Sequence, residues 1–201
     1  MQQDSNLLRL FIAVAVPEHV RQRIAEFQSR WQCAMPPHAV RWNPPEQIHL
    51  TLRFMGDVAA EALPALEQAL TRAAAGMGGF ELAASGSGCF PDATRPRVLW
   101  VGVGGELTAL GDLQARVARE TAAWGEIETR PFHPHLTLGR VKPVPPPVVR
   151  QVALVAQSQV CGELGRWRVD EVVLMRSELL PTGAQHTKLA RCVLGGVTPG
   201  P

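Results

Sequence analysis

The sequence predicts an α+β protein with antiparallel sheets, and two patterns in the chain lead to this prediction. Short runs rich in β-branched residues are mixed with three or four stretches that carry apolar residues at helical spacing. The spacing between these runs is irregular, whereas a regular strand–helix–strand repeat is typical of a parallel sheet. A length of 201 residues suffices for one large domain or two small lobes with a real core.

The first part of the chain contains three predicted strands and two predicted helices. Residues 8–16 (LRLFIAVAV) form a β-branched-rich run that ends at a proline, and residues 18–33 repeat apolar side chains at helical spacing. Two short strands are expected at residues 40–43 and 48–54, on either side of a Pro-Pro turn. Residues 60–75 form a second amphipathic helix, which stops at a cluster of glycines.

The rest of the chain continues the same mixture. A loop rich in Gly, Pro and Ser is expected after residue 84, and residues 143–147 form a rigid proline-rich loop. The predicted strands are residues 80–84, 98–103, 135–141, 167–175 and 187–194, and the predicted helices are residues 106–124 and 148–160.

The composition excludes several classes of protein. With 46% hydrophobic and 19% charged residues, and only four cysteines, the chain is neither a disordered tail, a collagen-like chain nor a disulfide-dense miniprotein. The cysteines form no CxxC pair, so neither a zinc ribbon nor a thioredoxin-type site is indicated. We expect a cytoplasmic protein, because the sequence has neither a signal-peptide core nor a charge-free apolar run of about 18 residues.

Most of the basic residues are arginines. The net charge of +2 is too small to indicate nucleic-acid binding by bulk electrostatics. There are 18 arginines but only two lysines, and tyrosine is absent. Codon usage in a GC-rich genome explains this choice, and the alternative is phosphate recognition, to which the guanidinium group is well suited.

One tetrapeptide occurs twice. The sequence His-Leu-Thr-Leu at residues 49–52 recurs identically at residues 135–138, and each copy follows a proline-containing approach. Because side chains alternate between the faces of a strand, the His and Thr of each copy point one way while both Leu residues point into the core. Each copy therefore presents an imidazole and a hydroxyl side by side.

Two such pairs facing each other supply the groups for metal-free phosphoryl transfer. A neutral imidazole can remove a proton from the attacking oxygen, and an imidazolium can protonate the leaving oxygen. An unperturbed histidine pKa of about 6.5 allows both states near neutrality. The threonine hydroxyls can donate hydrogen bonds to phosphate oxygens as charge builds up.

The repeated motif and its surroundings resemble a known family. The segments RLFIAVAVP, HLTLRFMGDV, PRVLWVGV and RPFHPHLTLGR occur in the order found in the 2H phosphoesterase superfamily, in its bacterial RNA 2′,3′-cyclic phosphodiesterase branch, historically called the 2′-5′ RNA ligase. The resemblance covers residues 8–194. It implies a bilobal α+β fold, in which two similar lobes, each an antiparallel sheet backed by helices, face each other across a concave cleft. Residues 1–201 would form this single domain, with one HxTx motif per lobe.

The resemblance also implies an activity. Enzymes of this branch hydrolyse the 2′,3′-cyclic phosphate of an RNA end to a 2′-phosphate, without a metal or nucleotide cofactor. By this resemblance His49 is the proton donor to the departing 3′ oxygen and His135 the proton acceptor from water, while Thr51 and Thr137 bind the phosphate. The reverse reaction would join RNA ends through a 2′-5′ linkage. The two identical motifs do not by themselves distinguish acid from base.

Three further residues are candidate substrate contacts. Arg130 stands five residues before His135, where the family also places an arginine, and would clamp the phosphate in preference to forming a surface salt bridge. Arg53 lies at i+2 from Thr51, so it is expected on the same strand face and could follow the RNA backbone. His186 stands where the family more often has a tyrosine and could bond a phosphate.

Other chemistry near the motifs is disfavoured. Phe132 or Trp42 could stack a terminal base, although core packing is the favoured role of each. His133 and His135 lack a neighbouring carboxylate or thiol at ligand spacing, so no metal site is expected. The Ser- and Gly-rich residues 85–88 lack the Gly-Lys-Ser/Thr ending of a nucleotide loop, which disfavours an ATP-dependent ligase.

The sequence thus predicts a monomeric phosphodiesterase that acts on RNA ends carrying a 2′,3′-cyclic phosphate, such as tRNA halves, with no membrane partner and no cofactor. Two alternatives remain open. One is a cyclic phosphodiesterase for small nucleotides, and the other is a non-catalytic RNA-binding protein of the same fold.

Overall fold

The computed structural model describes residues 6–125, 128–180 and 183–195, which contain four α-helices and nine strands. The helices are α1 (Glu18–Ala34), α2 (Leu63–Ala74), α3 (Leu107–Glu120) and α4 (Pro146–Ser158). The strands are β1 (Leu7–Ala15), β2 (Val40–Trp42), β3 (His49–Ala59), β4 (Phe80–Phe90), β5 (Val98–Gly105), β6 (His135–Val141), β7 (Glu163–Val169), β8 (Glu171–Leu180) and β9 (Gly183–Val193).

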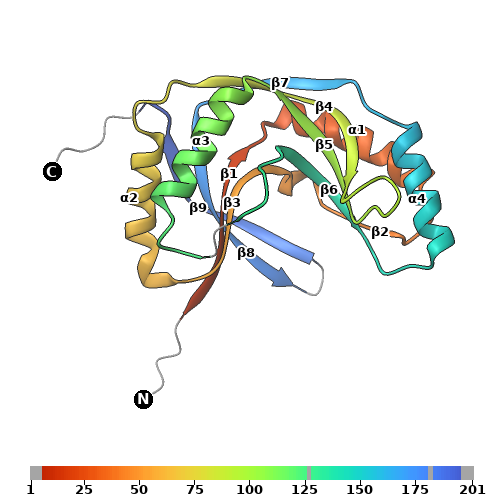
Figure 1. Ribbon diagram of the computed structural model, residues 1–201, viewed down its shortest axis with the longest axis horizontal. Coiled ribbons are helices and arrows are strands. Elements are labelled where there is room, and N and C mark those ends of the chain that lie inside the picture. Colours follow the sequence, from red (N-terminus) through yellow and green to blue (C-terminus); the bar gives the residue numbers. More distant parts are fainter. Residues whose placement is uncertain (1–5, 126–127, 181–182, 196–201) are drawn as a thin grey trace, which may run out of the picture.

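All strand pairs are antiparallel, and the strands join into one curled sheet. The order is β7-β4-β5-β6-β3-β1-β8-β9, with β2 paired to β6 beside this path. The predicted α+β class with antiparallel pairing is therefore confirmed. Figure 1 shows the sheet as an arch, with the β8–β9 hairpin reaching below its middle.

The sheet divides naturally into two lobes of similar construction. The β1 lobe contains β3, β1, β8 and β9 and carries α2 and α3, whereas the β6 lobe contains β6, β5, β4, β7 and β2 and carries α1 and α4 (Figure 1). Between β3 and β6 the only register pair in the described chain is Leu50 with Leu136. These residues are the first leucines of the two HLTL motifs, so the repeated motif itself forms the junction of the lobes.

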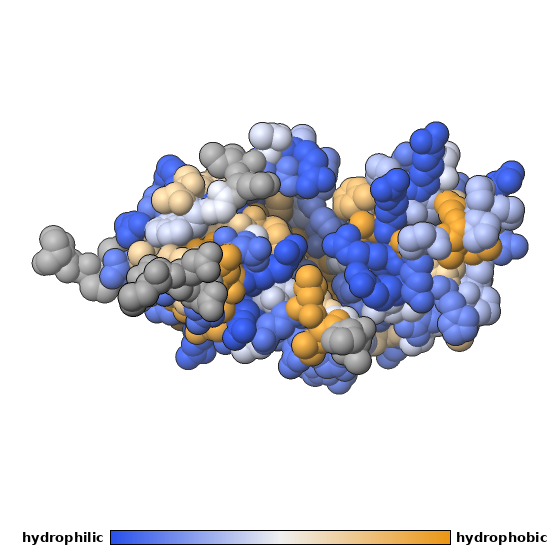
Figure 2. Space-filling model, turned by 90° about the horizontal axis from the view of Figure 1, so that it is seen from below, coloured by the Kyte–Doolittle hydropathy of each residue, from blue (hydrophilic) through white to orange (hydrophobic). Residues whose placement is uncertain are grey.

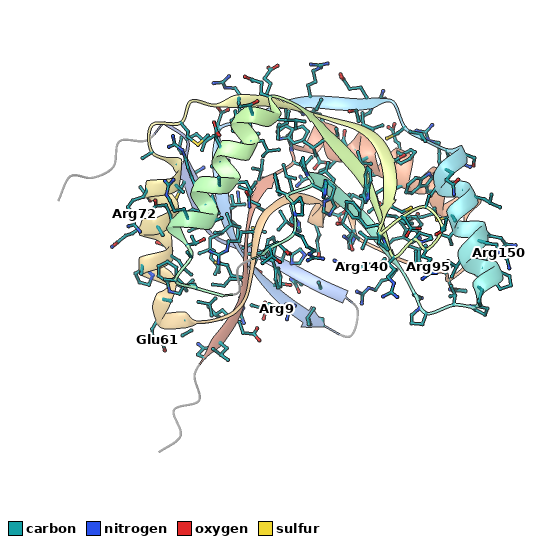
Figure 3. All side chains as sticks on the ribbon, in the orientation of Figure 1. Arg9, Glu61, Arg72, Arg95, Arg140 and Arg150 are labelled. Carbon is teal, nitrogen blue, oxygen red and sulfur yellow. The ribbon has the colours of Figure 1, made fainter. Side chains whose placement is uncertain are left out.

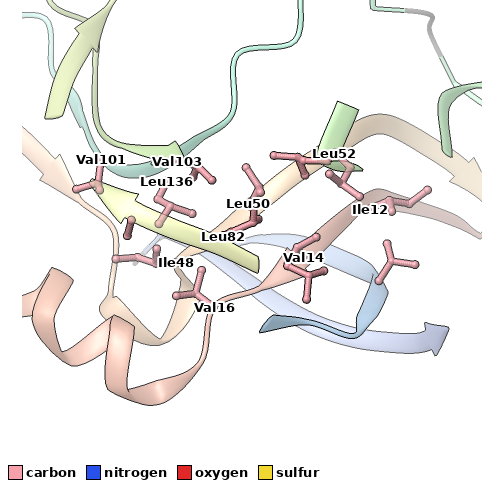
Figure 4. Close-up of a cluster of buried hydrophobic side chains, with 14 of the residues drawn as sticks. Ile12, Val14, Val16, Ile48, Leu50, Leu52, Leu82, Val101, Val103 and Leu136 are labelled. Atoms are coloured by element: carbon pink, nitrogen blue, oxygen red, sulfur yellow. The ribbon is translucent and has the colours of Figure 1, made fainter. Parts of the chain in front are cut away.

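The core lies between the sheet and the helices. Leu50, Leu136 and Leu138 are fully buried and Leu52 nearly so, whereas the His and Thr of each motif are half-buried on the other face. Figure 4 shows side chains of β1, β3, β4, β5 and β6 gathered in this core, including Ile12, Val101 and both first leucines. Burial of one such side chain contributes roughly 1.5–3 kcal/mol. The alternation predicted for both motifs is thus present.

The helices form close to where the apolar spacing predicts them. The buried apolar residues of α1 are Val20, Ile24, Phe27 and Trp31, which recur at helical spacing, and the Trp31 indole donates to the carbonyl of Gln159 just after α4. The third helix ends at Glu120, before the predicted residue 124, because the chain turns there at Thr121. None of the described helices is long and apolar enough to cross a membrane.

One predicted loop is wrong. Strand β4 continues through Ser85–Gly88 as far as Phe90, where the composition predicts a loop rich in Gly, Pro and Ser. A register shift between Ala84 and Ser87 absorbs the irregular backbone, and Gly86 there has a φ of +67°. A side chain at Gly88 would collide with the indole of Trp100, so the glycine is needed inside the strand.

One predicted strand is two strands. The run predicted as residues 167–175 divides at Asp170 into the end of β7, which pairs with β4, and the start of β8, which pairs with β1. The chain therefore passes from one lobe to the other at Asp170 and Glu171, a polar pair between two apolar runs. Side-chain periodicity does not record such a change of partner, which explains the error.

Candidate active site

The two HLTL motifs lie next to each other in antiparallel orientation. With Leu50 opposite Leu136, the register directs His49 toward Thr137 and Thr51 toward His135. All four polar side chains point to the face opposite the main core. That face is seen from below in Figure 2, and it is hollowed between the two lobes.

Both imidazoles are held in the same way by the backbone two residues earlier. Nδ1 of His49 lies 2.7 Å from the carbonyl oxygen of Gln47, and Nδ1 of His135 lies 2.7 Å from that of His133. A carbonyl oxygen can only accept, so Nδ1 carries the proton and donates in both residues. In both histidines this leaves Nε2 as the nitrogen that can exchange a proton with a ligand.

Burial makes both histidines weak bases. It lowers the pKa of His49 to about 4, with further lowering by the nearby His186 and His135 and an opposing effect of the Gln47 carbonyl. Burial also lowers the pKa of His135, and the charges of Arg140 and His133 lower it further. Both imidazoles are therefore neutral near pH 7 in the free protein.

His186 joins this group from β9. Its ring meets the His49 ring edge-on at 5.2 Å between centroids, and the Phe11 ring contacts both, at 4.6 Å from His49 and 4.9 Å from His186. Nδ1 of His186 is buried without a hydrogen-bond partner in the described chain, and burial lowers the pKa of this histidine. Because an orphaned buried N–H is rarer than an orphaned acceptor, the proton belongs on Nε2, which makes that nitrogen a donor.

His135 has a corresponding aromatic neighbour in the β6 lobe. The Phe90 ring meets it edge-on at 4.9 Å, and Trp100 packs against Phe90 at 5.3 Å. Trp100 pairs with Thr137 in the β5–β6 register, so it shares the face of the motif. The HLTL repeat by itself does not point to Phe11, Phe90 or Trp100 as neighbours of the histidines. Phe11 and Trp100 do fall inside segments that resemble the family, whereas no sequence signal identifies Phe90.

The two threonines offer free hydroxyl groups. Neither the Thr51 nor the Thr137 hydroxyl forms a hydrogen bond to another side chain or carbonyl in the described part of the chain. The backbone around Thr137 is fixed instead by Asn43, whose amide donates to the Thr137 carbonyl at 3.0 Å, and by Gln28, which donates to the Leu138 carbonyl at 3.0 Å. The β6 motif is therefore rigidly held while its hydroxyl stays available.

Arg53 does not share the face of His49 and Thr51, which corrects the expectation from the strand alternation. In the β1–β3 register, Ala13 pairs with Thr51, but the preceding residue, Ile12, pairs with Arg53. Leu52 is therefore an extra residue, a β-bulge, which turns Arg53 to the helix side of the sheet. Its side chain is buried and donates to the Thr121 hydroxyl and, at 2.8 Å, to the Trp124 carbonyl. Arg53 thus binds the end of α3.

The same bulge occurs in the second motif. Leu99 pairs with Gly139 but Trp100 with Thr137, so Leu138 is the extra residue and Gly139 takes the position of Arg53. A Cβ at Gly139 would lie 2.9 Å from the Arg41 carbonyl oxygen, which leaves room only for glycine. The next residue, Arg140, returns to the exposed face of the motif.

Arg130 lies on the surface in a loop before β6. Its guanidinium forms a bidentate ion pair with Glu128 at 2.9 and 2.6 Å, and its side chain is 83% exposed. No other described residue forms an ion pair with it. A surface pair of this kind contributes only about 0–1 kcal/mol, so an anionic ligand can displace Glu128.

The aromatic and metal-binding candidates are also placed. Trp42 and Phe132 are partly buried against the main core, in agreement with the favoured role of each. No group of three or more His, Cys, Asp or Glu side chains among the described residues is arranged to hold a metal ion. His133 lies exposed, and its carbonyl rather than its ring supports His135.

Comparisons with known proteins agree with this geometry. Residues 14–100 and 104–185 match the family model described as LigT like Phosphoesterase. The RNA 2′,3′-cyclic phosphodiesterase of Methanothermobacter thermautotrophicus is 35% identical over 182 residues, which cover 90% of this chain and 96% of the relative.

Solved structures show the same architecture. TT0787 of Thermus thermophilus superposes with a TM-score of 0.72 at 32% identity, covering 94% of this chain and 99% of that one. Escherichia coli LigT complexed with 3′-AMP superposes with a TM-score of 0.70 at 28% identity, covering 95% and 100%. The match of the family model over both lobes confirms the resemblance read from the sequence, and the chain belongs to the LigT-like phosphoesterase family.

Proposed function

We propose that this protein is an RNA 2′,3′-cyclic phosphodiesterase that opens the cyclic phosphate to a 2′-phosphate. The observation that carries the proposal is the pair of His-Thr motifs on adjacent strands, with both imidazoles anchored through Nδ1 and free at Nε2. Relatives that match nearly the whole chain bear the name of this activity, which supports the substrate class.

Two proton transfers complete the reaction. Nε2 of His135 accepts a proton from water as the water oxygen bonds to phosphorus, and Nε2 of His49 gives a proton to O3′ as the P–O3′ bond breaks. The product is a 2′-phosphate and a free 3′-hydroxyl. Each transfer contributes roughly 10²- to 10⁴-fold to the rate, and neither needs a metal or nucleotide cofactor.

Substrate binding would promote the protonation of His49, the proposed general acid. His49 with a pKa of about 4 is almost entirely neutral at pH 7, which is unsuitable for a proton donor. A phosphodiester anion beside the imidazoles favours their charged form and raises the pKa of both. We therefore expect His49 to take up its proton together with the substrate.

The neighbouring residues would bind the phosphate. Thr51 and Thr137 donate their hydroxyl protons to its non-bridging oxygens, and Nε2–H of His186 adds a third donor where the family more often has a tyrosine. Arg130 would exchange Glu128 for the phosphate. The reverse reaction, with an RNA hydroxyl in place of water, would form a 2′-5′ linkage.

The wider setting stays a prediction from the sequence. We expect a monomeric, cytoplasmic enzyme with tRNA halves among its substrates. We also propose that the two lobes act as a single domain, since the catalytic histidines belong to adjacent strands of one sheet.

An oligonucleotide that ends in a 2′,3′-cyclic phosphate tests the two roles. His49→Asn and His135→Asn should each lower kcat by at least about 10²-fold in the presence of a chelator, while exposed His19→Gln should leave it unchanged. Replacing O3′ with sulfur provides a leaving group that needs little protonation, so it should restore turnover by the His49 variant and not by the His135 variant. Near wild-type turnover by either variant on the oxygen substrate would refute the mechanism, and rescue of the His135 variant alone would reverse the roles.

A further inference from the structure

One group of exposed cations, near the outer end of the β6 lobe, is unusual because it lacks acidic partners among the described residues. Most other arginines of the described chain are neutralised, also within the β6 lobe, as in the pairs Arg166–Glu163 and Arg168–Asp170 at β7. Six exposed cations near the outer end of the β6 lobe form no ion pair with a described carboxylate. They are Arg41, Arg95, Arg97, Arg140, Lys142 and Arg150.

Four of these cations line a groove of about 940 Å³ between the loop at residues 91–97 and α4. They are Arg95, Arg97, Lys142 and Arg150, and no carboxylate is among the lining residues. Prolines, aliphatic side chains and the uncharged polar residues Thr94 and Gln157 supply the rest of the walls. The neighbouring carboxylate of Asp92 accepts hydrogen bonds from the Thr94 hydroxyl and from backbone amides, so it is used by the loop itself.

The other two cations stand directly opposite each other. Arg41 of β2 pairs with Arg140 of β6, so two positive side chains project from neighbouring strands. Like charges in this position destabilise a sheet. An anion bound between the two guanidinium groups would remove that repulsion, which is an indication of a ligand independent of the groove.

The groove lined by these four cations is connected to the face that carries His135. Strand β6 carries His135 at one end and Arg140 at the other, on the same face because of the bulge at Leu138. At roughly 3.3 Å per residue, Arg140 lies about 16 Å and Lys142 about 23 Å along the chain from His135. Phe90, which contacts His135, leads directly into the loop that forms one wall of the groove. Figure 3 shows Arg140, Arg95 and Arg150 in a row along the lower edge of this lobe.

We propose that these six cations, four in the groove and two on the adjoining strands, bind the phosphates of the RNA strand that leads up to the reacting end. This inference rests on the proposed function and extends it from one phosphate to a length of strand. The reacting group is at the 3′ end, so the bound segment is on its 5′ side. With at least 3.4 Å per nucleotide, no more than about seven nucleotides separate the cyclic phosphate from Lys142.

The groove should therefore matter only for long substrates. We compare a dinucleotide and a 12-nucleotide RNA, both ending in a 2′,3′-cyclic phosphate, in the variant Arg95→Gln/Arg97→Gln/Lys142→Gln/Arg150→Gln. We expect KM for the 12-mer to rise at least 10-fold with kcat unchanged, and both constants for the dinucleotide to stay within 2-fold. The salt dependence of log(kcat/KM) for the 12-mer should become shallower by about 0.7 for each phosphate that the variant no longer neutralises.

A charge-matched variant separates this effect from net charge. Arg23→Gln/Arg166→Gln/Arg168→Gln/Arg191→Gln removes four exposed cations that are paired with carboxylates, and it should leave the 12-mer kinetics unchanged. The inference is overturned if the groove variant has an unchanged KM for the 12-mer, or if KM rises equally in the control variant. Binding of another acidic macromolecule in the groove would not rescue it. Failure of the proposed function gives a different result, because the wild-type protein would then cleave neither RNA.

Discussion

At the scale of single residues, the two identical motifs acquire different surroundings. His49 is enclosed by Phe11 and His186, whereas His135 lies against Phe90 and within the electrostatic reach of Arg140. The sequence predicts the two histidines and two threonines, because their spacing alone identifies them. It does not predict the aromatic neighbours, since Phe11 and Phe90 are distant in sequence from the histidines that they contact in the folded chain.

His186 is the residue whose role is most open to test. Because Nε2–H of His186 would donate to a charged phosphate, His186→Phe should lower kcat/KM on a cyclic-ended RNA by about 10- to 100-fold, as expected for one such hydrogen bond of roughly 1.5–3 kcal/mol. His186→Tyr keeps a donor on an aromatic ring and should retain most of the activity. Steady-state kinetics of both variants decide the matter, and full activity of His186→Phe would show that no donor is needed there.

At the scale of elements, a single extra residue changes what a strand presents. The bulge at Leu52 turns Arg53 away from the face that carries His49 and Thr51 and toward the end of α3, where the positive charge meets backbone carbonyls. Simple alternation places Arg53 beside Thr51, and no sequence signal marks the bulge. The extension of β4 through Ser85–Gly88 is not predicted either, because a glycine-rich run is typical of a loop. Only the folded structure shows that the Trp100 side chain fills the space beside Gly88.

Arg53 should consequently affect stability and not substrate affinity. Arg53→Met removes the charged hydrogen bonds to the Thr121 hydroxyl and the Trp124 carbonyl, and we expect the free energy of unfolding to fall by about 2–3 kcal/mol. Arg116→Met, which removes one bond from α3 to the Ala75 carbonyl, should cost less. Urea unfolding and KM for the 12-mer are measured at a temperature where both variants are folded. A raised KM of the folded Arg53 variant would restore the RNA-contact role.

At the scale of the whole molecule, the proposed active site exists only where the two lobes join. One register pair, Leu50 with Leu136, brings the motifs together, so the separation of the imidazoles depends on the curl of the entire sheet. The sequence predicts the class of fold and the presence of one motif in each half. The common sheet, and the passage of the chain between lobes at Asp170, depend on long-range pairing that local patterns do not record.

The buried histidines should make the molecule sensitive to acid. His49 has a pKa of about 4 in the folded protein and about 6.5 when unfolded, so the unfolded state binds more protons below pH 6.5. The stability is therefore complete above pH 6.5 and falls as the pH decreases toward 4. Between pH 7.5 and pH 4.5, we expect the free energy of unfolding of His49→Gln to fall less than that of the wild type, by roughly 2–3 kcal/mol, as measured by urea unfolding. Equal losses would show that His49 is not held neutral.

The position of the phosphate in the product tests the central claim most directly. A 12-nucleotide RNA with a 2′,3′-cyclic end is hydrolysed by the wild-type protein in excess chelator, and the terminal nucleotide is identified by phosphorus NMR. Protonation of O3′ by His49 with water activated by His135 predicts a 2′-phosphate and no 3′-phosphate. A 3′-phosphate product would contradict the assigned roles, and an unchanged cyclic end would contradict the activity itself.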